Sequence, residues 1–93
     1  MAYRKETPDF TVEVDGAFDV DGIWRIDAVL RLREGISDAE KNALVGEARL
    51  ALVFGIIEAG QKGRALGATS VRTVMDGDRE IMGDSLEIGV PDR

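Results

Sequence analysis

The feature that most restricts the fold is the position of the apolar residues between residues 10 and 32. Ten of the thirteen stand at even-numbered positions, and charged residues fill most of the odd ones. Successive side chains of a β-strand point to opposite faces, so a period of two predicts strands with one buried and one solvated face. The even-numbered apolar residues are Phe10, Val12, Val14, Phe18, Val20, Trp24, Ile26, Ala28, Leu30 and Leu32. With Asp21-Gly22 as a turn signal between the two runs, this segment predicts a β-hairpin.

The matching parity of the two runs also predicts the length of their connecting loop. Residues directly opposite each other in an antiparallel pair share one face of the sheet. A two-residue loop at residues 21–22 would place Phe18 opposite Arg25 and so bury the wrong faces. A three-residue loop keeps even positions opposite even positions, and we therefore expect one.

Two three-residue loops satisfy this parity. Residues 20–22 would form a type I turn begun by Asp19, with Gly22 left-handed in a G1 bulge. Residues 21–23 have poorer turn chemistry, but they would pair Asp19 with Arg25 across the outer face. Turn chemistry favours the first loop, and parity alone leaves both registers open.

The odd-numbered face of this hairpin mixes both signs of charge. Its arginines would form an anion site if they lacked acidic neighbours, but acids accompany all of them. We therefore interpret this face as a solvated, charge-paired sheet surface. Its charged residues are Glu13, Asp15, Asp19, Arg25, Asp27, Arg31 and Arg33.

A helix is predicted to begin at Ser37. Ser37 and Glu40 have the spacing of a capping box, and Asp38 would lie favourably near the positive end of the helix dipole. Its end is less sharply marked, because glycines at 60, 63 and 67 can each follow a last turn. Lys62 and Arg64 favour a late end, near Leu66.

Residues 50–57 of this helix carry no polar side chain, although a helix on a single sheet should show one polar side to water. The favoured interpretation is that this surface packs on a second copy of the chain or on another protein. Two others remain open: the segment is a buried strand, or the chain covers both sides of the helix itself. The predicted interface residues are Leu50, Val53, Phe54, Ile56 and Ile57.

After the helix, residues 69–75 predict a strand and residues 76–78 a turn. The return run begins at Arg79 and ends at residues 86–90, with a bulge or break expected at 83–84. The sequence therefore predicts an α+β fold of the order β-hairpin, long helix, β-hairpin (ββαββ). We expect an antiparallel-rich four-stranded sheet with one helix packed on one face, in a single domain of residues 1–93. Residues 1–9 and 91–93 are expected to be flexible.

No catalytic, cofactor or metal site is predicted. The chain of 93 residues has no histidine and no cysteine, which removes the commonest general base and the thiolate nucleophile. An acidic cluster of Asp76, Asp78, Glu80 and Asp84 lacks the ligand spacing of an EF-hand and is read as a polar turn. Gly60, Gly63 and Gly67 do not lie between a strand and a helix start, so they are read as a helix exit and not as a phosphate loop.

The net charge of −6, from 18 acidic and 12 basic residues, gives no nucleic-acid footprint and no attraction to an anionic membrane. We expect a non-catalytic, cytoplasmic interaction or assembly protein that acts as a homodimer. One alternative is an acidic inhibitor that blocks a basic, nucleic-acid-binding surface of a partner protein. Another is a small-molecule binding protein with an apolar pocket between helix and sheet, lined by Trp24 and Phe54.

Overall fold

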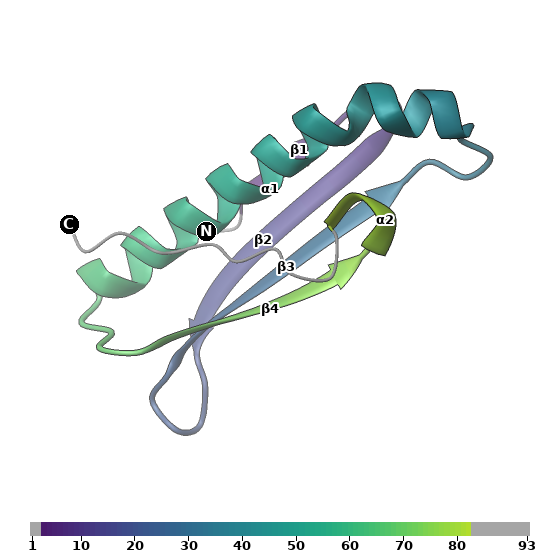
Figure 1. The fold of residues 1–93 in the computed structure, drawn as a ribbon. Helices are drawn as coiled ribbons and strands as arrows, with labels where there is room; N and C mark the ends of the chain where they lie inside the picture. The colour runs from purple at the N-terminus through teal and green to yellow at the C-terminus, as the bar shows by residue number, and fades with distance from the viewer. Residues whose placement is uncertain (1–2, 83–93) are drawn as a thin grey trace.

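A computed structural model describes residues 3–82 as a four-stranded sheet with one long helix lying along one face (Figure 1). Neighbouring strands follow the chain order β1-β2-β3-β4; the first two pairings are antiparallel and the third is parallel. The expected α+β, antiparallel-rich sheet with a helix on one face is thus confirmed. The elements are β1 (Tyr3–Glu6), β2 (Phe10–Phe18), β3 (Trp24–Leu32), α1 (Asp38–Ala65), β4 (Val71–Gly77) and α2 (Arg79–Met82).

The β2–β3 hairpin closes with the predicted three-residue loop at residues 20–22. The Asp19 amide donates to the Ile23 carbonyl (2.9 Å), and the Gly22 amide donates to the Asp19 carbonyl (3.1 Å). Gly22 has a left-handed φ of 77°, and Phe18 lies opposite Trp24 in the register. The rival loop at 21–23 is wrong because the Asp19 carboxylate accepts from the amides of residues 21 and 23 and so stabilises the turn at residues 20–22.

Strand β1 lies where a flexible polar lead-in was expected. It pairs antiparallel with the outer edge of β2, placing Tyr3 opposite Val14. A loop in which the Thr7 hydroxyl accepts from the amides of Asp9 and Phe10 joins the two strands. Arg4 also forms an ion pair with Glu13 across the strands. The prediction was wrong because the β2 edge supplies the hydrogen bonds that hold these polar residues in a strand.

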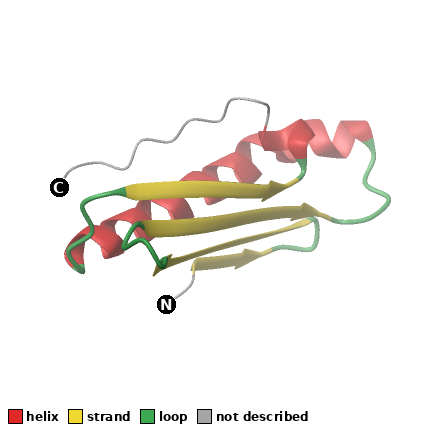
Figure 2. Ribbon diagram, turned by 90° about the horizontal axis from the view of Figure 1, so that it is seen from below, coloured by secondary structure: helices red, strands yellow, loops and turns green. Residues whose placement is uncertain are grey.

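Helix α1 determines the direction of β4. Its 28 residues span about 42 Å at 1.5 Å per residue, enough to return the chain along the whole sheet. Strand β4 therefore starts beside the beginning of β3 and runs parallel to it, with Trp24 opposite Val71 (Figure 2). A crossover of this kind is what parallel neighbours require.

The expected second hairpin is not formed by the described residues. Residues 79–82 form the short helix α2 instead of a returning strand. Ile81 and Met82 are buried in the core, and the Ile81 carbonyl accepts from Arg49 of α1. The end of the return run, at residues 86–90, and the bulge at 83–84 lie outside the described residues.

Both ends of α1 agree with the sequence signals. The Ser37 hydroxyl accepts from the Glu40 amide (3.2 Å) and donates to the Glu40 carboxylate (3.0 Å). At the other end, the Ala68 amide donates to the Gly63 carbonyl and the Gly67 amide to the Arg64 carbonyl, with Gly67 left-handed. These two bonds form a Schellman motif, so the helix ends near Leu66 as predicted.

The core lies between α1 and the sheet face that carries the even-numbered residues of β2 and β3. Trp24 forms its end: its indole N–H donates to the Ala59 carbonyl (2.9 Å). A Cβ atom on Gly63 would lie 2.5 Å from Cγ of that indole, and one on Gly16 would lie 2.6 Å from its Cζ2. The ring is therefore held between two glycines. The sheet contributes Phe10, Val12, Val14, Trp24, Ile26, Ala28 and Leu30 to the core.

The hairpin loop can be tested at Gly22, where φ is 77° and a Cβ would have nothing within 4 Å. Gly22→Ala should therefore lower the free energy of unfolding through backbone strain alone, by about 1 kcal/mol. Gly22→Asn should cost less, because asparagine tolerates the left-handed conformation better. Urea titration followed by Trp24 fluorescence measures both, and equal costs would contradict the loop geometry.

The helix cap gives a second test. Ser37→Ala should lower the free energy of unfolding by about 1 kcal/mol, whereas Ser37→Thr, which keeps the hydroxyl, should change it much less. A loss of only a few tenths of a kcal/mol in urea titration at pH 7 would show that the cap does not stabilise the helix.

The loss of stability caused by Ser37→Ala should also depend on pH. Hydrogen bonds from the Ser37 hydroxyl and amide, with the nearby Arg33 guanidinium, hold the pKa of Glu40 below its usual value. A carboxyl group whose pKa is lower in the folded than in the unfolded chain stabilises the fold at pH values above its unfolded pKa. That stabilisation is lost as the pH falls through its folded pKa. The difference between wild type and Ser37→Ala should therefore narrow below about pH 4.5. A difference that widens there would contradict this assignment.

Candidate functional site

Helix α1 packs against the sheet through an inner face rich in small residues. A Cβ atom on Gly55 would lie 2.6 Å from both Tyr3 Cδ1 and Val14 Cγ2, so the helix backbone approaches the sheet closely there. Leu52 and Ile56, both fully buried, supply the large side chains of this face. The buried residues of α1 are Ala48, Ala51, Leu52, Gly55, Ile56, Gly60 and Gly63.

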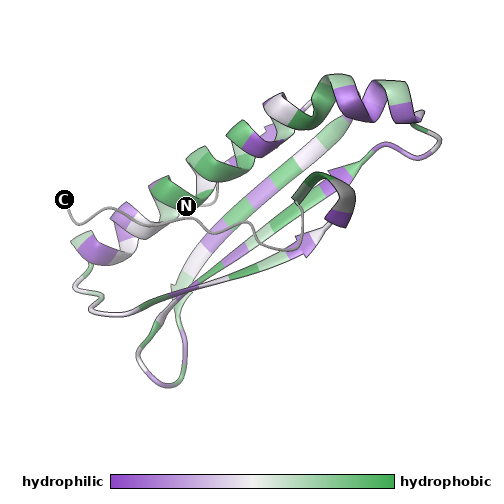
Figure 3. Cartoon of the chain, in the orientation of Figure 1, coloured by the Kyte–Doolittle hydropathy of each residue, from purple (hydrophilic) through white to green (hydrophobic). Residues whose placement is uncertain are grey.

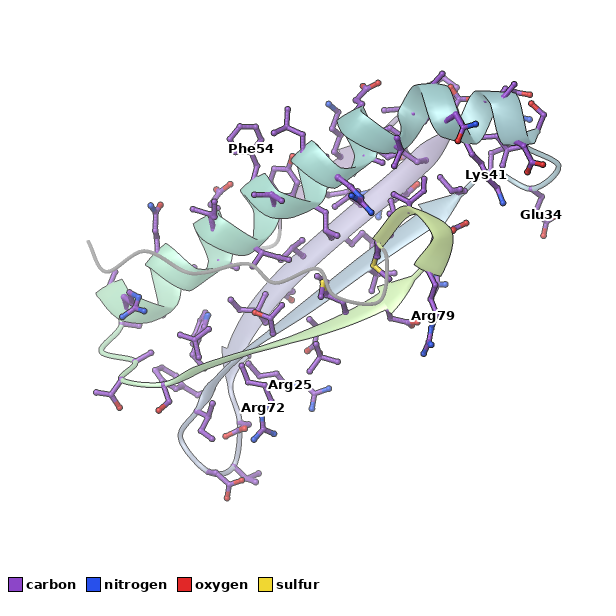
Figure 4. All side chains as sticks on the ribbon, in the orientation of Figure 1. Arg25, Glu34, Lys41, Phe54, Arg72 and Arg79 are labelled. Carbon is purple, nitrogen blue, oxygen red and sulfur yellow. The ribbon has the colours of Figure 1, made fainter. Side chains whose placement is uncertain are left out.

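The face of α1 turned away from the sheet is apolar as well. Leu50 is 55% exposed and Phe54 is 56% exposed, while Val53 and Ile57 are half-buried. Figure 4 shows Phe54 projecting from the side of α1 opposite the sheet, and the middle turns of the helix are almost continuously green in Figure 3. Two of the largest exposed apolar side chains of the described residues thus lie one helical turn apart.

This surface continues toward the start of the helix as a stripe of small residues. Ala39, Ala43 and Gly46 are exposed, and a Cβ on Gly46 would meet nothing within 4 Å. Ala39, Ala43, Gly46, Leu50, Val53 and Ile57 are spaced by four, three, four, three and four residues, which is the a/d spacing of a coiled-coil seam, and Phe54 lies beside this series. We call Ala39, Ala43, Gly46, Leu50, Val53, Phe54 and Ile57 the outer stripe.

Four of the five predicted interface residues belong to the outer stripe. The fifth, Ile56, has no exposed surface and contributes to the core, so its assignment to an interface was wrong. The prediction included it because apolar residues surround the whole helix at 50–57 and carry no signal for direction. Ala39, Ala43 and Gly46 were missed because they lie outside this apolar run and have small side chains. The strand interpretation of residues 50–57 is also wrong, since all eight residues are helical.

The opposite surface of the molecule, the outer face of the sheet, is charged. Arg25 pairs with Asp27 (2.9 Å) and Arg31 with Asp76 (3.6 Å), both pairs being well exposed. Arg72 lies beside Arg25 in the parallel register, and Figure 4 shows both on the side away from α1. Exposed pairs of this kind each stabilise a fold by at most about 1 kcal/mol. This face agrees with its interpretation as a solvated, charge-paired surface.

The other candidate residues do not converge on one site. Trp24 is buried inside the core, whereas Phe54 projects from the far side of α1, so the two do not line a common pocket. Gly60 and Gly63 pack inside α1 against the sheet, and Gly67 ends the helix. Among residues 3–82, no group of three or more acidic side chains is arranged to hold a metal ion.

Two further findings concern membrane spans and similarity to known proteins. Within the described part of the chain, neither helix combines the length and the apolar character needed to cross a bilayer. Comparisons with protein-family models, with curated proteins and with solved structures found no match to this chain.

Shortening a side chain should lower the free energy of unfolding more on the inner face of α1 than on its outer face. Ile56→Ala should lower the free energy of unfolding by about 2–5 kcal/mol, because it leaves a cavity in the core. Phe54→Ala should change it by less than about 1 kcal/mol, since more than half of that side chain is already in water. Urea titration at submicromolar concentration, read by Trp24 fluorescence, compares the two without a contribution from association. Equal losses would contradict the assignment of the faces.

Proposed function

We propose that this protein is a non-catalytic, cytoplasmic assembly module that forms a homodimer through the outer stripe of α1. The observation that carries the proposal is the exposure of Leu50 and Phe54 in the middle of a helix whose other face is already buried. A chain without cysteine gains nothing from an oxidising compartment, which supports the cytoplasmic placement.

The energetics favour a second copy as the occupant of this surface. Fully burying a leucine or phenylalanine side chain is worth roughly 1.5–3 kcal/mol. A two-fold contact removes each such side chain from water once in each copy, and so doubles the gain from a small patch. Association itself costs about 4–15 kcal/mol. Gain and cost are of the same order, so we expect the dimer to form in a concentration-dependent way.

The charge pattern also favours α1 over the outer face of the sheet as the place of the proposed contact. Arginines and acids on the outer sheet face largely satisfy one another, so this face offers little net attraction to a partner. The outer stripe is uncharged, and its Leu50 and Phe54 side chains are more than half exposed. A contact of this kind should persist in high salt, where exposed charges are screened within about 3 Å.

Sedimentation equilibrium of the wild-type chain at tens of micromolar tests the proposal. The mass should approach twice the 10.1 kDa of one chain, both at 0.15 M and at 1 M salt. Phe54→Glu should return it to 10.1 kDa, because a charge would be placed in the contact. Val20→Glu is the matched control: it adds the same charge at a fully exposed loop residue and should leave the dimer intact.

A wild-type chain that remains at 10.1 kDa over this concentration range would contradict the proposal. A dimer that dissociates at 1 M salt would also contradict it. That result would favour the charge-based alternative, in which the acidic chain binds a basic partner surface.

A further inference from the structure

Strand β4 is an edge of the sheet (Figure 2). It pairs with β3 on one side, and among residues 3–82 no strand pairs with its other side. Edge strands of soluble proteins are usually short, or carry lysine, proline or a bulge, and these features discourage pairing with a second chain. The opposite edge, β1, has four residues and includes a lysine. Strand β4 has seven residues, neither lysine nor proline, and an unbroken register with β3, so it is the edge better suited to pairing.

The backbone groups of β4 that point away from β3 belong to its odd-numbered residues. The Trp24 amide donates to the Ser70 carbonyl, and the Asp78 amide donates to the Leu30 carbonyl, both at 3.0 Å. Successive residues of a strand turn their amide and carbonyl groups to opposite sides, and the register between these two bonds is continuous. The even-numbered residues of β4 therefore bond to β3, and the odd-numbered ones direct their groups toward the free edge.

The outer-face side chains of β4 are charged at both ends and apolar between them. Arg72, Val74 and Asp76 are all exposed. Arg72 forms no ion pair with any of residues 3–82, and it lies beside a like charge, Arg25. Asp76 accepts from the next backbone amide (2.8 Å) and pairs with Arg31 at 3.6 Å, but its side chain is still 73% exposed. A carboxylate has about four acceptor positions, so Asp76 can also bind a second arginine.

We infer that β4 pairs antiparallel with β4 of a second copy, about a two-fold axis at Val74. This contact lies at the edge of the sheet and goes beyond the proposed function, which uses the outer stripe of α1. Arg72 of each copy then lies opposite Asp76 of the other. Thr73 lies opposite Met75, and these odd-numbered residues exchange backbone hydrogen bonds. The Arg72–Asp76 pairs fall at non-hydrogen-bonded positions, where opposite side chains lie closer together.

Charge selects this register from the other two-fold ones. An axis at Arg72 would place two arginines opposite each other, and an axis at Asp76 would do the same with two acids. An axis at Thr73 or Met75 would place Val74 opposite a charged residue and leave that charge without its complement. The axis at Val74 pairs both charges twice and places the two valines, each 36% exposed in one copy, against each other.

The edge contact should be weaker than the contact through the outer stripe. Val74 is less exposed than Leu50 and Phe54, so pairing removes less apolar surface from water. We therefore expect edge pairing at millimolar concentration, above the range in which the outer stripe associates. A chain with two separate two-fold contacts joins its dimers into larger assemblies, because each contact leaves the other one free.

Charge reversal tests the register in the full-length Phe54→Glu chain, whose outer stripe carries a charge. Sedimentation equilibrium at millimolar concentration should show a dimer of this chain. Adding either Arg72→Glu or Asp76→Arg should weaken that dimer about tenfold, because like charges then lie opposite each other twice. A mixture of these two chains should dimerise as well as the parent, because every acid then faces an arginine. Arg4→Glu is the matched control, since it reverses an exposed arginine on β1 and should leave the contact unchanged.

Amide hydrogen exchange tests the backbone contact without any substitution in β4. In the Phe54→Glu chain, the amides of Thr73 and Met75 should exchange more slowly at millimolar than at micromolar concentration, as measured by NMR. The amides of Arg72 and Val74 bond to β3 and should be protected equally at both concentrations. This measurement tests the contact even if a charge-reversed chain unfolds.

Three results would overturn the edge contact. The first is a Phe54→Glu chain that remains monomeric at millimolar concentration. The second is protection of the Thr73 and Met75 amides at every concentration, which would show that the chain covers this edge itself. The third is a mixture of the two charge-reversed chains that associates no better than either chain alone. None of these results affects the proposed dimer through the outer stripe, which is measured on the wild-type chain at tens of micromolar.

Discussion

The close approach of α1 to the sheet is the constraint on which the rest of the structure depends. Gly55 and Gly63 lack the Cβ atoms that would collide with Val14, Tyr3 and the Trp24 indole. Because the backbone lies so near, the inner face of the helix has room mainly for glycine and alanine, with Leu52 and Ile56 as its large members. The indole N–H of Trp24 then bonds to the helix backbone and locks the end of this interface.

This packing leaves the molecule with two layers and two unlike outer surfaces. The outer face of the sheet is mainly charged, and its ion pairs include Arg25–Asp27 and Arg31–Asp76. The helix presents the outer stripe on the side away from the sheet, and the apolar members of this stripe are not among the buried core residues. An isolated two-layer domain has no third element among its described residues to cover that stripe, and the apolar surface therefore directs our functional proposal to the helix.

The predictions that succeeded depend on local geometry. The parity of the β2–β3 hairpin follows from the two-residue period of a strand, and the turn follows from the Asp19 carboxylate and the left-handed Gly22. Strand β1 and helix α2 were missed because neighbours elsewhere in the chain stabilise them: β1 is held by the edge of β2, and α2 by burial of Ile81 and its bond to Arg49. Elements this short have too few residues to show a recognisable apolar period in the sequence.

For the surface proposed to dimerise, the sequence by itself determines that the middle of α1 is apolar all round, that the helix begins at Ser37, and that it ends near Leu66. It contains no information on which side meets the sheet, because a helix that is apolar in every direction has no preferred orientation. Packing supplies that choice. The glycines permit close approach on one side only, and this places Ile56 in the core and leaves Leu50 and Phe54 facing solvent.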